Sequence, residues 1–396
     1  MLTPYPRLQR KFFFNTYKVL LFVYFINSMH PWFMLKIPSV IISLIFLIPT
    51  IIAAFKGYFN YKGHKIAIIC TCLMFLWIAK DANFYGIIEA IINIIIISSL
   101  ICLKPSPLLD TLNSIIKWLS VILIISIIFY ILFLVGINLP HSTLDVTTAT
   151  RTITFDNYYV FIQQYEIFGL TRFYSIFLEP GYLTLGIAPL LYIKRYNLKD
   201  RSTLILFVAQ LLSFSLAGYI VLICGFVYTI FCGKERLKLK KSVISITILT
   251  LSLLSAYNFL GEDYFEQTIF RRIQFVNGTL SGDDRSSNYL DYEYEKLISS
   301  DDKWTGTYFD VNKSEKGVAG FKLFTVENGI IGVFLVIILY LSLISFRIRF
   351  NYSTGLIILL LLLLYQNAYP WASCVLYPAI CARYAFKKEY AEYVAK

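Results

Sequence analysis

The chain has 396 residues, of which 58% are apolar and only 15% are charged. A soluble domain carries roughly 25% charged residues. Together with a mean hydropathy of +0.66, this composition excludes a soluble enzyme, a disordered chain and a nucleic-acid-binding module. The net charge of +12 does not change this conclusion, because Lys and Arg occur mainly in short clusters between apolar runs. The sequence therefore predicts an integral membrane protein.

Apolar runs that could cross a bilayer recur along the whole chain. They cover residues 19–35, 37–55, 66–79, 87–103, 118–137, 182–193, 203–232, 243–260, 323–346 and 355–386. The runs 203–232 and 355–386 are too long for one crossing, so we expect each to form two short helices. The first pair would turn near residues 213–219, and the second near residues 367–370, where Pro370 breaks a helix. These runs predict an all-α bundle of about 12 transmembrane helices.

The distribution of positive charge gives this bundle an orientation. Most of the 36 Lys and Arg residues fall in segments that the predicted topology places on one side, which is typical of the cytoplasmic side. Both termini are then cytoplasmic, and the first span is expected to remain uncleaved. The predicted regions are N-terminal transmembrane helices (1–137), a first outward loop (138–178), central transmembrane helices (179–260), a large outward loop (261–321) and C-terminal transmembrane helices (322–396).

The large outward loop is expected to be partly helical. Its residues 287–300 form an amphipathic stretch with Leu290, Leu297 and Ile298 on one side. Long outward loops on a helical bundle usually carry the function or the contacts with partners.

Cysteine and histidine spacing gives no sign of a metal or a disulfide framework. All seven cysteines lie inside or at the edge of apolar runs, and no CxxC pair occurs. His30, His64 and His141 lie far apart in the chain. We therefore expect no metal and no cofactor.

Two ionisable residues stand at the outer mouth of the helix predicted near residue 182. Arg172 and Glu179 precede Pro180, and proline disfavours helical geometry at the residue before it. Glu179 should therefore lie at the helix boundary, beside N–H groups without an intrahelical partner. An ionisable residue at the entrance to a span is a functional candidate. The alternative is that Glu179 only caps its helix.

Three arginines in the large loop form a second candidate group. Arg271 and Arg272 follow an apolar run, and Arg285 precedes the predicted helix that Ser286 or Ser287 could cap. Guanidinium groups bind phosphate through paired hydrogen bonds and stay charged at any working pH. The alternative for Arg271 and Arg272 is contact with lipid headgroups.

A third motif, TVENGIIG at residues 325–332, opens the span after the large loop. Gly329 and Gly332 permit close helix contact, and Glu327 should lie near the outer boundary. We interpret it as a helix-terminal packing motif. The three groups together indicate outward chemistry on an anionic, membrane-bound substrate, because arginines can neutralise a diphosphate leaving group while a carboxylate takes a proton from an attacking hydroxyl.

In their order along residues 172–332, these motifs resemble those of the O-antigen polymerase and ligase superfamily of polytopic membrane glycosyltransferases. The order is an Arg before Glu-Pro-Gly, a helical hairpin, a span, an outward loop with an Arg pair and Gly-x-x-Arg, and then Glu-x-Gly-x-x-Gly. The ligase branch has a His and a polar residue where this chain has Val318 and Ala319. This departure favours the polymerase over the ligase.

The resemblance implies an enzyme of O-antigen or related surface polysaccharide biosynthesis. Such an enzyme joins oligosaccharide repeat units carried on undecaprenyl diphosphate at the periplasmic face of the bacterial inner membrane, so both outward loops would be periplasmic. It implies no metal and no cofactor. Its partners would be the lipid-linked oligosaccharides, membrane lipids and a chain-length regulator protein, and not nucleic acid.

The resemblance also suggests roles for individual residues. Arg172, Arg285 and one of Arg271 or Arg272 would hold the two diphosphates. Glu179 is the first choice for the general base. Tyr289 and Tyr308 would stack on sugars.

Two other classes stay open. A secondary transporter or a flippase of lipid-linked sugars also has about twelve spans and keeps polar residues near the bilayer midplane. The candidates for such residues are Lys18, Glu89, Asn93 and Gln210. Most polar residues lie in the outward loops instead, which favours an enzyme. The remaining alternative is a structural membrane scaffold.

Overall fold

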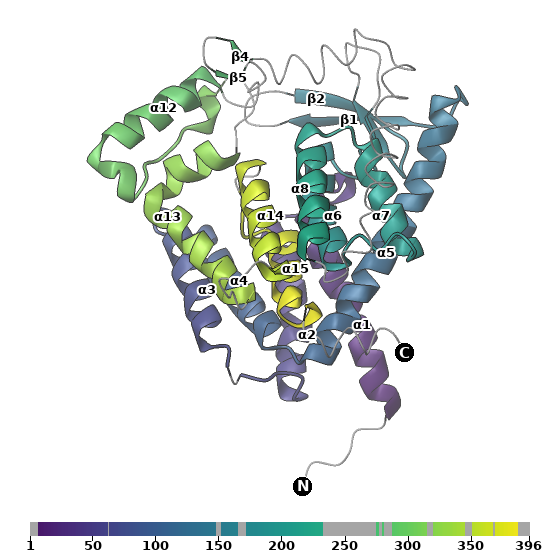
Figure 1. The fold of residues 1–396 in the computed structure, drawn as a ribbon, viewed down its shortest axis with the longest axis horizontal. Coiled ribbons are helices and arrows are strands. Elements are labelled where there is room, and N and C mark those ends of the chain that lie inside the picture. Colours follow the sequence, from purple (N-terminus) through teal and green to yellow (C-terminus); the bar gives the residue numbers. More distant parts are fainter. Residues whose placement is uncertain are drawn as a thin grey trace.

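Figure 1 shows the computed structural model of the chain, a bundle of apolar helices with strands and one further helical unit at one end. It describes residues 7–61, 63–147, 152–164, 172–232, 275–276, 279–280, 287–314, 320–344, 351–366 and 369–386. The predicted span 243–260 and the three loop arginines, Arg271, Arg272 and Arg285, lie outside these residues.

Twelve α-helices lie in the described residues, which confirms the mainly helical prediction. They are α1 (Arg7–Asn27), α2 (Ser39–Phe55), α3 (Lys65–Ile78), α4 (Phe84–Cys102), α5 (Pro105–Leu134), α6 (Pro180–Ile193), α7 (Arg201–Leu212), α8 (Leu216–Cys232), α12 (Asn288–Ser299), α13 (Gly320–Ile344), α14 (Tyr352–Gln366) and α15 (Ser373–Ala385). Three short 3₁₀ turns are also present, η1 (Trp32–Met34), η4 (Asp301–Trp304) and η5 (Val311–Lys313). Every predicted apolar run that falls in the described residues overlaps with one or two of these helices, although α1 ends at Asn27 and so covers only part of the run 19–35.

The outer surface of the bundle is apolar, as expected of a protein that lies in lipid. Among the described residues, three helices are long and apolar enough to cross a membrane: α4, α5 and α13. The shorter α2 buries Ile42 and Phe46 in the core, and its opposite face is also apolar. The residues on that opposite face are between 38% and 88% exposed and follow the helical period: Ile41, Leu44, Ile45, Ile48, Ile51, Ile52 and Phe55. Contact of such a surface with water is unfavourable, whereas its contact with lipid acyl chains is favourable.

The two long apolar runs are each divided, as predicted. Residues 203–232 form α7 and α8, separated at residues 213–215, where Phe214 has a φ of 44°. Residues 355–386 are divided between α14, which ends at Gln366, and α15, which begins at Ser373. The breaks fall at polar residues and at Pro370, where helical hydrogen bonding is most easily lost.

The centre of the bundle is formed by two helices that are buried on nearly all sides. In α6 every residue from Leu183 to Ile193 is buried, and in α15 so is every residue from Ser373 to Ala382. The two helices pack against each other. Any side chain at the start of α6 is therefore held by the most rigid part of the fold.

The prediction of an all-helical fold was wrong in the first outward loop, which contains a three-stranded antiparallel sheet. The order is β1 (Ser142–Thr147), β2 (Thr152–Asn157) and β3 (Ile162–Gln164). Leu144 faces Phe155 across the first pair of strands, and alternate residues such as Val146 and Ile153 pack with them against the bundle. Alternation of β-branched and polar residues favours strands over helix. A two-stranded ribbon, β4 (Phe275–Val276) with β5 (Thr279–Leu280), lies in the second loop.

The second outward loop contains α12, as predicted. Ser287 caps this helix, since its hydroxyl accepts the N–H of Leu290 at 3.1 Å. Leu290 and Leu297 are buried in a small core with Phe309. The expected position of Ile298 on the same side was wrong, because Ile298 is 42% exposed.

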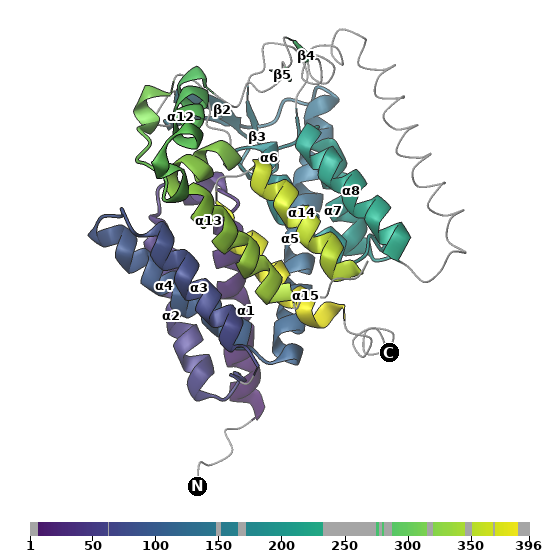
Figure 2. The same ribbon diagram turned by 60° about the vertical axis from the view of Figure 1, so that its left-hand side comes forward.

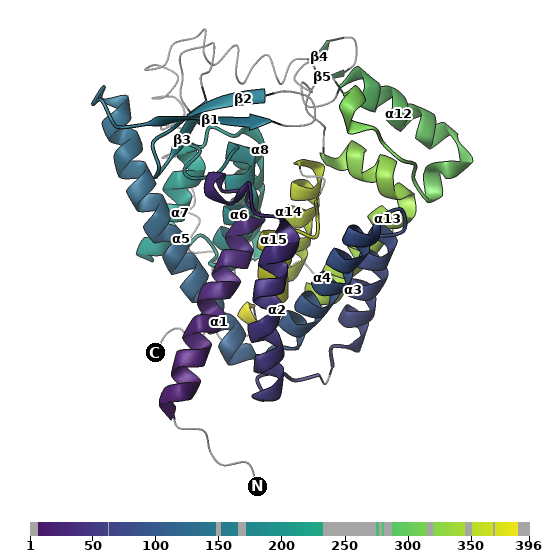
Figure 3. The same ribbon diagram turned by 180° about the vertical axis from the view of Figure 1, so that it is seen from behind.

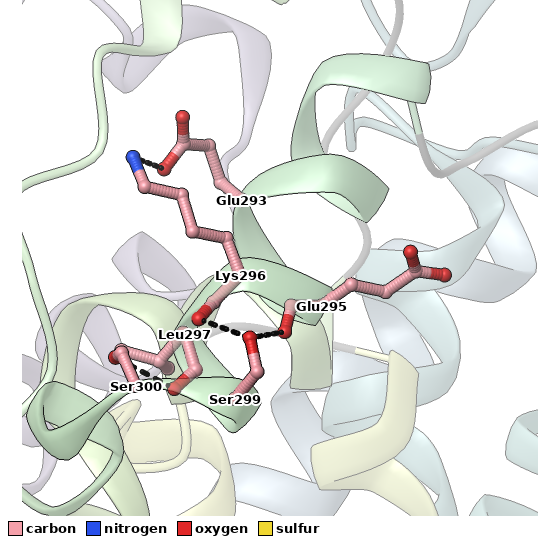
Figure 4. A network of polar contacts seen from close by, with 6 residues as sticks. All are labelled: Glu293, Glu295, Lys296, Leu297, Ser299 and Ser300. Carbon is pink, nitrogen blue, oxygen red and sulfur yellow. Dashed lines mark hydrogen bonds and ion pairs between the residues drawn. The ribbon is translucent and has the colours of Figure 1, made fainter.

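Figure 4 shows the hydrogen bonds that the carbonyl groups at the C-terminal end of α12 accept. The Ser299 hydroxyl donates to the carbonyls of Glu295 and Lys296, at 3.0 and 2.9 Å. These carbonyls lie in the last turn, where helical partners are missing. Lys296 pairs with Glu293 at 3.5 Å, while the carboxylate of Glu295 points away from both.

A break in α13 joins the α12 unit (residues 287–314) to the bundle. Gly329 has φ 64° and ψ −174°, which divides α13 into two helical arms. Gly306, which follows η4, packs its backbone directly against this break: a Cβ on Gly306 would lie 2.5 Å from the carbonyl oxygen of Glu327. The Thr307 N–H donates to the Val326 carbonyl at 2.7 Å. Only glycines allow two backbones to approach so closely.

Two side chains of the α3 end complete this junction. The Trp77 ring N–H donates to the Asn328 carbonyl at 2.9 Å, and the Lys80 ammonium donates to the Thr305 carbonyl. The α12 unit is therefore held by α3 on one side and by the first arm of α13 on the other.

All of the strands and α12 lie at one end of the bundle, opposite to the end at which α1 begins (Figures 1 and 2). Seen from behind, the sheet lies above α7 and α8 and beside the upper end of α5, whereas α12 lies over α13 (Figure 3). This separation agrees with the predicted topology, in which both long loops emerge on the same side. We call this the outer end.

We predict that Gly329→Ala destabilises the protein more than Gly136→Ala. Both glycines have positive φ, but a Cβ on Gly136 meets nothing within 4 Å, whereas one on Gly329 meets the Trp304 carbonyl group. Gly136→Ala should cost about 1–2 kcal/mol and Gly329→Ala about 2–5 kcal/mol. Unfolding of the purified protein in detergent measures both, and equal losses would contradict the described junction.

Candidate functional site

The segment that carries Arg172 and Glu179 is clamped between helices at the outer end. The Phe173 N–H donates to the Leu212 carbonyl at the end of α7, at 3.1 Å. Further along, the Trp32 N–H donates to the Ile176 carbonyl at 2.9 Å. The segment is thus fixed at both ends by backbone hydrogen bonds, although it belongs to no helix or strand.

Glu179 lies at the first residue outside α6, as the sequence predicted. Its backbone is extended, with φ −141° and ψ 146°, and α6 begins at Pro180. Glu179 is the N-cap residue of this helix, and its side chain makes no capping hydrogen bond. The side chain is exposed. Its carboxylate therefore lies at the surface of the outer end.

Tyr182, one turn into α6, connects Glu179 to two other parts of the chain. Its hydroxyl interacts electrostatically with the Glu179 carboxylate and with the Tyr369 hydroxyl. Its ring packs on the His30 ring, with 4.5 Å between the centroids. The His30 carbonyl also accepts the N–H of Leu178 at 3.2 Å. The α1–η1 turn thus supports Tyr182 from one side.

Tyr369 brings a second carboxylate to the site. It lies in the break between α14 and α15, and its ring packs on Trp371 at 5.6 Å between centroids. Desolvation of the hydroxyl, followed by the nearby Glu327 carboxylate, raises the pKa of Tyr369. At the same time 46% of Tyr369 stays exposed. Two acidic residues therefore lie near these tyrosines: Glu179 near Tyr182, and Glu327 near Tyr369.

Glu327 owes its position to the junction described above. It lies two residues before the break at Gly329, and its backbone carbonyl lies against Gly306. The side chain is partly buried. The motif does pack closely, as predicted, and Glu327 also lies near the Tyr369 hydroxyl.

The predicted site residues fall into three groups. Glu179 belongs to the site just described, and Arg172 is partly buried at the start of the same clamped segment. Tyr308 is 86% exposed beside the junction, whereas Tyr289 is partly buried against Phe309, with 5.3 Å between ring centroids. Arg271, Arg272 and Arg285 lie outside the described residues.

Sequence reasoning missed His30, Tyr182 and Tyr369, and it assigned Glu327 to packing. A signal existed for two of them: Tyr182 stands three residues after Glu179, on the same face of the helix start, and Tyr369 directly precedes the helix-breaking Pro370. The contact between residues 327 and 369 depends on how α13, α14 and α15 pack, and no local pattern contains it.

The site offers carboxylates, phenols and an imidazole. Within the described residues no three His, Cys, Asp or Glu side chains are grouped as metal ligands. What the arrangement can do is accept a proton at a carboxylate and hold hydroxyl groups by hydrogen bonds.

No family model, no curated protein and no solved structure matches the chain.

We predict that His30 makes stability fall in mild acid. Burial lowers the pKa of His30, so the folded protein favours the neutral ring. Between the folded and unfolded pKa values the unfolded chain binds more protons. Stability should therefore rise with pH through this window, level off above about 6.5, and be lost as the pH falls below it.

Thermal unfolding in detergent between about pH 5 and 8 measures this effect. His30→Asn removes the titrating group and tolerates the left-handed backbone of residue 30 (φ 53°), so the variant should lose part of the acid sensitivity. His141→Asn is the matched control at an exposed residue. Identical pH profiles for the wild type and His30→Asn would refute the assignment.

Proposed function

We propose that the protein is a membrane glycosyltransferase that polymerises oligosaccharide repeat units linked to undecaprenyl diphosphate, as an O-antigen polymerase does. The observation that carries the proposal is that Glu179 and Glu327 lie near Tyr182 and Tyr369, respectively, at one end of an apolar bundle. The order of motifs along the sequence supports the same activity.

The proposed chemistry needs a proton acceptor and a positive charge. Glu179 takes the proton from the hydroxyl of the acceptor sugar, whose oxygen then bonds to the anomeric carbon of the donor. The bond from that carbon to the lipid diphosphate breaks, and the diphosphate leaves with the electron pair. Arg172, at the start of the same clamped segment, stabilises the negative charge of the leaving group.

The surroundings suit a substrate that is itself in the membrane. The exposed faces of helices such as α2 are apolar along their length, whereas the strands and α12 gather at the outer end (Figure 1). A lipid tail can stay in the bilayer while its diphosphate and sugars reach that end. We infer that the outer end is periplasmic, that the protein lies in a bacterial inner membrane and that both termini are cytoplasmic.

A transporter or flippase of lipid-linked sugars is the second candidate, and the polar residues within the bundle argue against it. Lys18 pairs with Asp110 at 2.5 Å, and the Gln210 amide donates to Thr184 at 3.0 Å. Glu89 and Asn93 are bonded to other partners: Ser39 donates to Glu89 at 2.6 Å, and Tyr24 donates to Asn93 at 2.9 Å. Glu89 and Asn93 both lie near Tyr24, whereas Lys18 and Gln210 have other partners. The four residues are therefore not held in one cluster, which argues against the midplane site of a transporter.

We predict that Glu179→Gln abolishes polymer formation by the purified protein in proteoliposomes. The substrate would be a synthetic lipid-diphosphate repeat unit, and gel electrophoresis would resolve chain lengths. Loss of the proton acceptor should reduce the rate by about 10²-fold or more. Arg172→Ala should also slow elongation, because the leaving group loses its counter-charge.

Glu295→Gln is the matched control, since Glu295 is an exposed carboxylate on α12 that points away from its neighbours. It should give the wild-type ladder. An unchanged ladder from Glu179→Gln would exclude the assigned base. Transfer of intact repeat units across the bilayer without any elongation would support the flippase instead.

A further inference from the structure

Exposed aromatic side chains flank Glu327 at the junction between the α12 unit and α13. Trp304 is 51% exposed and Tyr308 is 86% exposed. They lie on either side of Gly306, whose backbone contacts Glu327. Tyr369, 46% exposed, approaches the Glu327 carboxylate from the break between α14 and α15. Three exposed aromatic residues from two parts of the chain thus lie at the junction that holds Glu327.

Their positions are fixed by the backbone rather than by the rings themselves. The Trp304 carbonyl group lies against Gly329, and the Thr307 N–H, next to Tyr308, donates to the Val326 carbonyl at 2.7 Å. Lys80 holds the intervening Thr305 carbonyl. A rigid backbone that leaves large rings exposed is unusual for packing and typical of binding, because exposing these rings brings no gain in stability.

The charge around Glu327 decides which kind of ligand fits. A diphosphate needs positive charge, which this carboxyl group does not supply, whereas a sugar offers hydroxyl donors that a carboxyl oxygen accepts. The C–H faces of a sugar ring pack on aromatic rings, and a few polar groups fix its orientation. The nearby Lys80 ammonium is already engaged by Asp81 at 3.7 Å and by the Thr305 carbonyl. The site therefore suits an uncharged saccharide.

We propose that Trp304, Tyr308, Glu327 and Tyr369 bind the sugar chain of the acceptor, with the two α12-unit rings stacking on sugars and Glu327 accepting their hydroxyls. This inference rests on the proposed function and divides the outer end into two parts. Arg172 and Glu179 face the diphosphate and the reacting hydroxyl, and the aromatic site holds the acceptor chain. Tyr182 and Tyr369 join the two parts.

Equilibrium dialysis tests the aromatic site without turnover. The probe is the labelled oligosaccharide repeat unit released by mild acid from the lipid-linked intermediates of the source cells, and the full chain is held in lipid nanodiscs. Trp304→Ala and Tyr308→Ala should each raise the Kd by about 3- to 10-fold. Glu327→Gln should also weaken binding, whereas Trp304→Tyr should largely restore it.

Tyr292→Ala is the matched control, because Tyr292 is equally exposed, at 62%, on α12, and has no contact with the junction. Its Kd should equal that of the wild type. Unchanged unfolding temperatures for the Trp304 and Tyr308 variants separate lost binding from lost folding.

Equal binding of the oligosaccharide by wild type and variants would refute the proposed aromatic site. Quenching of Trp304 emission by brominated lipids would also refute it and would indicate that Trp304 contacts the membrane. Failure of the proposed function looks different: the wild type would bind the oligosaccharide, and the variants would lose it, yet no polymer would form. Normal polymer length and normal Kd in Trp304→Ala and Tyr308→Ala would overturn the aromatic site alone.

Discussion

The backbone contact between Gly306 and Gly329 determines where the rest of the outer end lies. It lets the α12 unit rest directly on a broken helix, and it places Glu327 between that unit and the α14–α15 break. A side chain at either glycine would push the two backbones apart, because a Cβ on either one would lie closer than 3.0 Å to backbone atoms of the other segment. Both glycines also have positive φ. The acidic, aromatic site is therefore a consequence of two glycines in segments that are distant in sequence.

The remaining structure supplies a rigid frame around this contact. The central helices α6 and α15 are buried on nearly all sides, so the start of α6, with Glu179 and Tyr182, cannot move independently of the bundle. The outer helices present apolar faces, which lipid can cover. The protein thus keeps its polar chemistry at one end and its apolar surface along the sides. This division suits a substrate with a lipid tail and a polar head.

Much of the fold could be predicted from the sequence because its determinants are local. Apolar runs locate the helices, Pro180 places Glu179 outside α6, and excess length alone divides residues 203–232 into two helices. The sheet was missed although its signal was present: residues 143–147 and 152–156 alternate Leu, Val, Ile and Phe with Thr and Asp. Ile298 was misplaced because a short amphipathic helix leaves the edge of its apolar face ambiguous.

The site could be predicted only in part, for a different reason. Arg172 and Glu179 lie in one short motif, and the sequence shows that these two charged residues precede an apolar helix. The approach of Glu327 to Tyr369 arises from the packing of three helices, and the conformation of Gly329 cannot be read from its neighbours. The motif around Glu327 suggested packing because glycines near a helix end usually serve that purpose.

The central claim is that residues near 179 and near 327 share one substrate at the outer end. Photo-cross-linking tests it most directly, with a lipid-diphosphate repeat unit that carries a photoreactive group on its first sugar, followed by mass spectrometry of the labelled peptides. The account predicts label both in residues 172–182 and in residues 304–329, and less label when unlabelled substrate competes. Label confined to the opposite end of the bundle, or to only one of these segments, would contradict it.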